Sequence, residues 1–371
     1  LLVIPSLFVP FAELGLRQSG IFHTGENSNK NKLSTTILTI SIISSVVMSL
    51  FVLLIFIIND DLAVFTGFQS LVIFLYIPIM GAIRPIFGVF LGENKTTLYN
   101  NYRWGPAAIK LAFILTFTLF LKLGVNEALF SMIIGEFILI IYGLYHLCNF
   151  AKISISNFDF KLAKSLVFKG VFFCLSFAVI KMNHRIDVFL LKEFSVKSTD
   201  IGYYINGVGI AELVWQIPTI LGLIILSKVK KKNNKKFMIA KSLRFSNTIV
   251  FFSSIFIIIF CDFIITTLYG IDFRGSVIVT QYILIGVVLF NSFQILNSYY
   301  ESSGQPLKIL TFTFPALLIN LTINLILIPK FGINGAVWST NISYLVCSVL
   351  FTLRFSLKEN IPLQDMLFLK K

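Results

Sequence analysis

The chain has 371 residues, of which 56% are hydrophobic and only 13% are charged, and its formal net charge is +14. A soluble domain has about 45–50% apolar and about 25% charged residues, so this composition excludes an ordinary water-soluble protein. Long apolar stretches recur along the whole sequence, and they predict an all-α, polytopic helical membrane protein.

Eleven apolar segments are predicted to span a membrane, because each is long enough to cross about 30 Å of hydrocarbon. In chain order they cover residues 1–16, 34–58, 64–91, 104–123, 127–149, 166–194, 201–226, 239–269, 276–300, 307–329 and 333–354.

Lysine and arginine alternate between the two ends of these spans. We count 23 on one side and 7 on the other, and basic residues favour the cytoplasmic side, so the C-terminus is predicted to be cytoplasmic. The run KVKKKNNKK (228–236) is interpreted as part of this cytoplasmic charge and not as a nucleic-acid site. No loop is long enough for a nucleotide-binding domain, which places any function inside the bilayer.

Three pairs of short segments indicate an internal repeat. PFAELGLRQ (10–18) resembles GIAELVWQI (209–217), KLGVNEALFS (122–131) resembles KFGINGAVWS (330–339), and LGENK (91–95) resembles SSGQP (302–306). Their common order and similar offsets predict two parallel six-helix bundles. We assign 1–149 to the N-terminal bundle, 150–165 to an interfacial cytoplasmic linker, and 166–371 to the C-terminal bundle; the repeat also predicts that the first helix is missing from this chain.

Arg84 is predicted at membrane depth in the segment YIPIMGAIRPIFG (76–88). Pro78 and Pro85 interrupt helical hydrogen bonding there, so we expect a kinked or unwound helix. A guanidinium stays charged, and charged groups in spans usually face a cavity, so Arg84 is predicted to face an anion in a water-filled lumen. The alternative is a snorkelling side chain or an ion pair with Glu13.

The stretch KMNHRIDVF concentrates polar residues beside long apolar runs. At 100° per residue, Lys181, His184 and Arg185 share one helical arc, while Asn183 and Asp187 fall on another face. One face is therefore predicted to bond to a neighbouring helix and the other to line the lumen. The alternative is that the span ends earlier and the cluster forms an outer loop.

Two further groups of polar residues complete the candidates. Glu13 and Glu212 occupy matching places in the repeat, where they pair with the arginines or one of them carries a coupling proton. The amides between 281 and 324 favour helix packing over a path for sugars. The four cysteines and three histidines show no metal-binding spacing, so no metal or cofactor is expected; a coupling ion, H⁺ or Na⁺, is left open.

Three segments carry a resemblance to a known family. NHRIDVFLLKEFSVKSTDIGYY (183–204), AELVWQIP (211–218) and LILIPKFGINGAVWSTNIS (325–343) resemble the second lobe of bacterial polysaccharide flippases. These form the O-antigen (Wzx-type) branch of the multidrug/oligosaccharidyl-lipid/polysaccharide exporter superfamily, and the likeness extends over nearly the whole chain. Arg185 and Asp187 match the family stretch directly, whereas Arg84 fits the family's lumen arginines only by type and depth.

The resemblance implies a non-enzymatic flippase of the bacterial inner membrane. It would move an undecaprenyl-pyrophosphate-linked oligosaccharide by alternating access through a cationic central cavity, among membrane lipids and with the polymerase and chain-length machinery as candidate partners. Arginine suits this substrate because its planar donors bind phosphate in pairs. The competing hypotheses are a multidrug cation antiporter of the same fold, a membrane-embedded polymerase or glycosyltransferase, and a scaffold.

Overall fold

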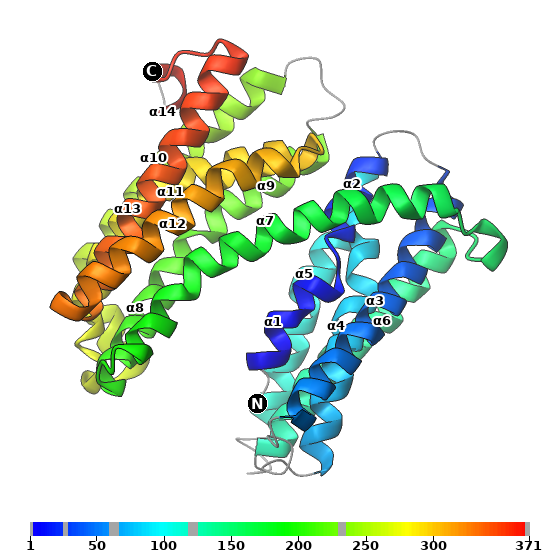
Figure 1. The fold of residues 1–371 in the computed structure, drawn as a ribbon, viewed down its shortest axis with the longest axis horizontal. Coiled ribbons are helices and arrows are strands. Elements are labelled where there is room, and N and C mark those ends of the chain that lie inside the picture. The colour runs from blue at the N-terminus through cyan, green and yellow to red at the C-terminus, as the bar shows by residue number, and fades with distance from the viewer. Residues whose placement is uncertain (1–2, 25–28, 59–66, 118–124, 229–234, 368–371) are drawn as a thin grey trace. The chain divides into compact units, whose positions relative to one another are not determined.

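The computed structural model describes residues 3–24, 29–58, 67–117, 125–228 and 235–367, and all regular structure among them is helical (Figure 1). The chain divides into two compact units, Leu1–Leu175 and Ser176–Lys371, called here the first and the second unit. The division falls inside the long helix α7. The sequence-based boundaries at 149/150 and 165/166 stay a prediction.

Within its described residues, the first unit contains six helices, a 3₁₀ turn and the beginning of α7. They are α1 (Val3–Ala12), α2 (Leu16–Thr24), α3 (Lys30–Ile58), α4 (Gly67–Gly92), α5 (Thr96–Leu115), α6 (Val125–Phe150), η3 (Ile155–Asn157) and α7 (Phe160–Glu193).

The second unit contains the remainder of α7 and the helices that follow. They are α8 (Ser198–Val214), α9 (Gln216–Lys228), α10 (Lys235–Tyr269), η5 (Ile271–Phe273), α11 (Ser276–Ser302), α12 (Pro306–Phe331), α13 (Ile333–Glu359) and α14 (Gln364–Leu367).

Eight helices within the described residues are long and apolar enough to cross a membrane, judged by length and composition: α3, α4, most of α6, α7, most of α10, α11, α12 and α13. Of the other three predicted spans, 1–16 falls on α1, 201–226 falls on α8 and α9, and 104–123 falls on α5 and continues outside the described residues. The polytopic all-α fold expected from the sequence is thus confirmed.

The predicted span 201–226 is divided into two helices, and the predicted span 1–16 ends at a break between two helices. Between α1 and α2 the chain turns at Leu14 and Gly15, whose φ angles of 47° and 60° do not continue a right-handed helix. Between α8 and α9 the break falls at Trp215, and Pro218 lacks the N–H that would bond back into the preceding turn. Both breaks lie in the segments that the repeat had aligned, beside Glu13 and Glu212.

The turns after α4 and α11 have the same hydrogen-bond pattern, as the alignment of 91–95 with 302–306 predicts; the turn at Ser195 after α7 has this pattern too, so the internal repeat stays a prediction. Asn94 N–H bonds to Leu91 O and Lys95 N–H to Phe90 O, at 3.0 and 2.8 Å. Gly304 N–H bonds to Glu301 O and Gln305 N–H to Tyr300 O, both at 3.0 Å. The φ angles of Asn94 and Gly304 are 61° and 64°, so two segments of different sequence make the same turn.

Helix α4 runs without interruption through Pro78 and Pro85, so of the two expected alternatives around Arg84 the unwound segment is wrong and the kink stays a prediction. Each proline removes one backbone donor, and this loss is tolerated because α4 is held on several sides by α2, α3 and α6. Pro85 itself is buried in this packing.

The first unit includes one very close backbone approach. A Cβ atom built on Gly15 would lie 2.2 Å from Gly170 O, and one built on Gly170 would lie 2.2 Å from Leu14 O. Glycine is therefore required on both sides where the α1–α2 break rests on α7.

Candidate functional site

The first unit holds a charged cluster contributed by three helices. Arg84 of α4 donates from Nη2 to Glu136 Oε2 of α6 at 3.0 Å, and Lys110 of α5 donates from Nζ to Glu136 Oε1 at 2.6 Å. The Glu136 side chain is 4% exposed, while those of Arg84 and Lys110 are 23% and 21% exposed. Each carboxylate oxygen thus serves one cation.

This cluster carries one more positive charge than negative. Two cations share a single carboxylate, and Arg84 Nε is buried without a hydrogen-bond partner. Glu13 also interacts electrostatically with Arg84 without forming an ion pair, so the excess is that of the ion-paired trio alone. Charge inside a membrane protein is costly unless it is paired, which makes Arg84 and Lys110 candidate functional residues. Chemically, the cluster can attract an anion that reaches the exposed parts of Arg84 and Lys110.

Glu136 is the ion-pair partner of Arg84, a role that the sequence analysis had given to Glu13 as an alternative. The predicted alternative, an Arg84–Glu13 ion pair, is replaced by the Arg84–Glu136 pair. Glu13 lies instead in the α1–α2 break, where its carbonyl accepts the Leu16 N–H at 2.9 Å and its side chain is partly exposed.

In the second unit Arg185 of α7 pairs with Glu212 of α8, as the sequence had offered for one of its two glutamates. Arg185 Nη2 lies 3.1 Å from Oε1 and 3.2 Å from Oε2 of Glu212. The Arg185 side chain remains 47% exposed. Lys181, one turn away on the same helix, is also exposed.

Asp187 points to the opposite side of α7 and is 2% exposed. Its Oδ2 accepts hydrogen bonds from the hydroxyls of Tyr204 and of Thr340, the latter at 3.2 Å, and its Oδ1 accepts from Val188 N–H at 2.8 Å. Among the residues that the structure describes, Asp187 forms no ion pair. A carboxylate held only by neutral donors can take up a cation or a proton.

Asn183 lies one turn before Asp187 and anchors a neutral hydrogen-bond network. Asn320 Nδ2 of α12 donates to its carbonyl and to its Oδ1, both at 3.1 Å, and Ser343 Oγ of α13 donates to Oδ1 at 2.9 Å. Ser339 Oγ donates to Asn320 O at 2.8 Å. The expectation that amides of this region join helices is confirmed here.

His184 lies within an aromatic cluster of the second unit. Its Nδ1 is 2.8 Å from Tyr344 Oη, and its ring centroid is 4.8 Å from that of Trp215 and 5.5 Å from that of Phe290. The predicted cavity set is therefore divided by the structure. Asn183, Asp187 and His184 contact other helices of the second unit, while Lys181 and Arg185 present charge at its surface.

Sequence reasoning missed Lys110 as a site residue and left Glu136 without a defined partner. Lys110 had been counted among the loop cations, although it lies near the end of α5 and faces Glu136. The available signal was Glu136 itself, because a lone acid in a span requires a cation nearby. In the described ranges no group of three His, Cys, Asp or Glu side chains can hold a metal ion.

Comparison with known proteins identifies the fold. No protein-family model and no curated protein sequence matches the chain. A solved MATE structure in the straight conformation matches with a TM-score of 0.76 at 13% identity, covering 97% of this chain and 87% of that one. An outward-facing multidrug resistance MATE transporter of the MOP superfamily matches with a TM-score of 0.75 at 12% identity, covering 96% and 86%.

A third structure is a MOP superfamily transporter from Pyrococcus furiosus, described as having a binding pocket of reverse polarity that suggests a different function. It matches with a TM-score of 0.75 at 14% identity, over 96% of this chain and 86% of that one. Identities this low support a statement about architecture only. The chain has the polytopic helical fold of the MATE transporters of the MOP superfamily.

Proposed function

We propose that the protein is a transporter that moves a polyprenyl-pyrophosphate-linked oligosaccharide across the bacterial inner membrane by alternating access. The observation that carries the proposal is the excess cation in the first unit, where Arg84 and Lys110 share Glu136. A diphosphate cannot enter hydrocarbon unless its charge is met by partners. A transporter for such a substrate needs fixed positive charge inside its spans.

The types of cation fit this substrate. The Arg84 guanidinium offers planar donors to phosphate oxygens, and its buried Nε has no other partner. Lys110 adds a compact charge from the neighbouring helix, and Arg185 is half exposed at the surface of the second unit. Because each arginine keeps one carboxylate partner, the phosphate would compete with that carboxylate instead of meeting a bare cation. This arrangement favours reversible binding, as transport requires.

The competing proposal is a multidrug cation antiporter. Two observations favour it: the similarity to a solved multidrug resistance MATE transporter, and the buried Asp187 carboxylate, which makes no ion pair among the described residues. For either substrate, Asp187 is our proposed carrier of a coupling proton or Na⁺. The sign of the charge on the transported molecule distinguishes the two proposals.

Transport can be tested with the full-length protein in liposomes. One preparation contains a fluorescent polyprenyl-pyrophosphate oligosaccharide, whose movement to the outer leaflet is scored by a membrane-impermeant quencher. A second contains a cationic dye. We expect the lipid to move and the dye to stay; the reverse result favours the cation antiporter, and a stationary lipid contradicts our proposal.

Lys110→Gln is the most informative variant. It removes the excess charge while leaving the Arg84–Glu136 pair in place, so the fold should be retained and lipid movement should fall at least about tenfold. Lys330→Gln is the matched control, because Lys330 is an exposed cation at the end of α12. Equal transport by both variants would remove the cluster from the mechanism.

A further inference from the structure

The segment that connects α6 to α7 presents an exposed apolar and basic surface, which we call the linker surface. Its apolar side chains are outward-facing: Ile155 is 95% exposed and Phe160 is 78% exposed, with Phe158 and Ile153 at 38% and 37%. Lys152, Lys161 and Lys164 are exposed among them. A loop that faces water normally covers its large apolar side chains, whereas Ile155 and Phe160 are the most exposed apolar side chains of this segment.

The linker backbone is fixed in place by polar contacts with α3. Lys152 N–H donates to Asn31 Oδ1 at 2.9 Å, and Asp159 N–H donates to Thr36 Oγ1 at 3.2 Å. Lys32 Nζ lies 3.3 Å from Asp159 Oδ2. The apolar residues therefore face outward because the opposite side of the segment is bonded to the first unit, and not because the segment lacks structure.

The charges of the linker surface do not cancel. Asp159 is its one acid, and its Oδ1 accepts the N–H groups of Lys161 and Leu162 at the start of α7. The Leu162 N–H and the Lys32 ammonium hold the pKa of the Asp159 carboxyl below its usual range. Since this carboxylate is already engaged, the three exposed lysines leave the surface positively charged.

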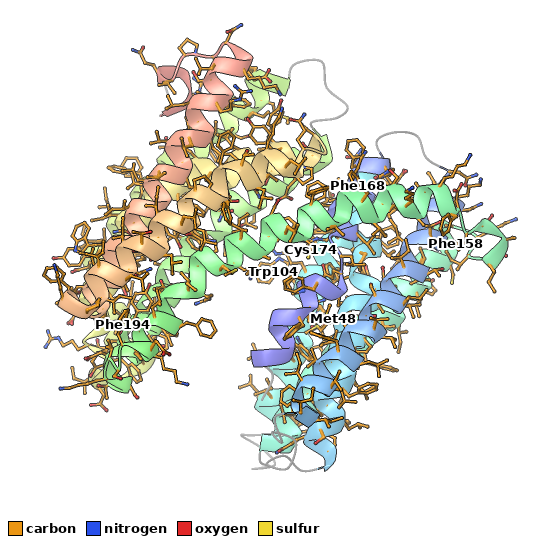
Figure 2. All side chains as sticks on the ribbon, in the orientation of Figure 1. Met48, Trp104, Phe158, Phe168, Cys174 and Phe194 are labelled. Carbon is orange, nitrogen blue, oxygen red and sulfur yellow. The ribbon has the colours of Figure 1, made fainter. Side chains whose placement is uncertain are left out.

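The position of the surface along α7 matches a bilayer interface. Phe168 is 66% exposed and lies two turns, about 12 Å, beyond Phe160 on the same side of the helix. Lys164 lies between them. Along this side, exposed apolar and basic residues therefore follow one another from Ile155 to Phe168, which lies inside a candidate membrane span. Phe158 and Phe168 are labelled in Figure 2.

We propose that the linker surface docks on anionic phospholipid headgroups of the membrane, with Ile155 and Phe160 inserted at the level of the acyl-chain boundary. An amphipathic segment with lysines beside large apolar side chains has this behaviour. Negatively charged headgroups match the uncompensated lysines, whereas zwitterionic headgroups do not. This binding is independent of the transported substrate and holds for either proposal made above.

Insertion can be measured with a fluorophore on Ile155→Cys in the Cys148→Ser background, since Cys148 is the exposed cysteine among the four. The protein is reconstituted into phosphatidylcholine vesicles that contain shallow doxyl-labelled lipid, with or without phosphatidylglycerol. We expect blue-shifted emission and doxyl quenching that increases with phosphatidylglycerol and weakens at high salt. Emission typical of water, quenched by iodide and not by doxyl lipid, would overturn the proposal.

Lipid selectivity is the second measurement. Electron paramagnetic resonance of spin-labelled phosphatidylglycerol gives its affinity relative to phosphatidylcholine at the protein surface. Replacing Lys152, Lys161 and Lys164 by glutamine should lower the affinity of that site by roughly fivefold for each lysine. The control replaces three exposed lysines elsewhere, Lys192, Lys197 and Lys330. If the control lowers phosphatidylglycerol binding as much as the linker variant, the selectivity is not a property of the linker surface.

Discussion

The two units place different chemistry at corresponding positions of corresponding helices. Gly304 follows Asn94 by 210 positions, and their turns share the same hydrogen bonds. At that offset the counterpart of Arg84 is Gln294 and the counterpart of Lys110 is Asn320. At the offset of 208 that relates the next pair of helices, the counterpart of Glu136 is Tyr344.

This comparison distinguishes side chains that the fold needs from side chains that are present for another reason. In the second unit Asn320 belongs to a buried neutral network, and Tyr344 pairs with His184. At the offsets that the repeat predicts, the second unit therefore carries neutral polar side chains at these three places. Charge at Arg84, Lys110 and Glu136 is thus particular to the first unit, which supports a functional reason for it.

The largest expected effect comes from removing the one acid of the charged cluster. Glu136→Gln leaves two partly buried cations without their ion-pair partner, and breaking a fully buried pair in this way costs about 3–5 kcal/mol, which is the upper bound here. We expect a large fall in the free energy of unfolding, or failure to accumulate in the membrane. Denaturant unfolding in detergent and quantification of membrane-inserted protein measure it.

The counterpart substitution in the second unit sharpens this prediction. Tyr344→Phe removes only the hydroxyl that bonds to His184, a neutral interaction worth about 1 kcal/mol. If Glu136→Gln is no more damaging than Tyr344→Phe, the cluster is solvated well enough that the cations need no partner.

The next effect concerns the broken helices. Gly15→Ala places a Cβ 2.2 Å from the Gly170 carbonyl and forces alanine to φ near +60°, so we expect a loss of about 2–4 kcal/mol. Gly209→Ala in α8 is the control in the other unit, because a Cβ there meets nothing within 4 Å. It should be neutral or stabilising by about 0.5–1 kcal/mol. Thermal unfolding of both variants checks the difference, and equal melting temperatures would show that the α1–α2 break can move away from α7.

The third comparison is between the stability costs of alanine at Lys110 and at Asn320, its counterpart in the second unit. Asn320→Ala removes the Nδ2 donor to Asn183 Oδ1 and the Oδ1 acceptor of Asn324 Nδ2 in a buried network, which should cost about 1–3 kcal/mol. Lys110→Ala leaves the Arg84–Glu136 pair intact and should cost less than that. Chemical denaturation distinguishes them. A larger loss for Lys110→Ala would mean that the lysine is structural, which would weaken its assignment to substrate.

The sequence predicted the features that depend on composition and local repetition. The all-α membrane fold followed from apolar runs, and two of the three aligned pairs of short segments lie at helix breaks or turns in the structure. The ion pair of Arg185 with Glu212 was among the expected alternatives, because both residues lie where their helices can meet.

What the sequence did not predict depends on packing between distant segments. The sequence offered Arg84 only Glu13 as an ion-pair partner, and the approach of α6 to α4 selects Glu136 instead. Hydrophobicity along the predicted span 201–226 did not indicate the break at Trp215, because the segments on both sides of it are hydrophobic. The uninterrupted α4 was also missed, since a proline's effect depends on which neighbours hold the helix.

The smallest expected effect tests the matching turns after α4 and α11. Asn94 and Gly304 occupy the same left-handed conformation, with φ of 61° and 64°. Asparagine adopts this region at little cost and glycine at none, so Asn94→Gly and Gly304→Asn should each change stability by less than about 1 kcal/mol. A β-branched residue cannot adopt it easily, so Gly304→Val should be clearly worse than Gly304→Asn. Melting temperatures of the four proteins, including the unsubstituted one, provide the comparison. If valine is tolerated at 304 as well as asparagine, the turn of the second unit is free to change its backbone, and the correspondence between the two turns would not be a constraint on the fold.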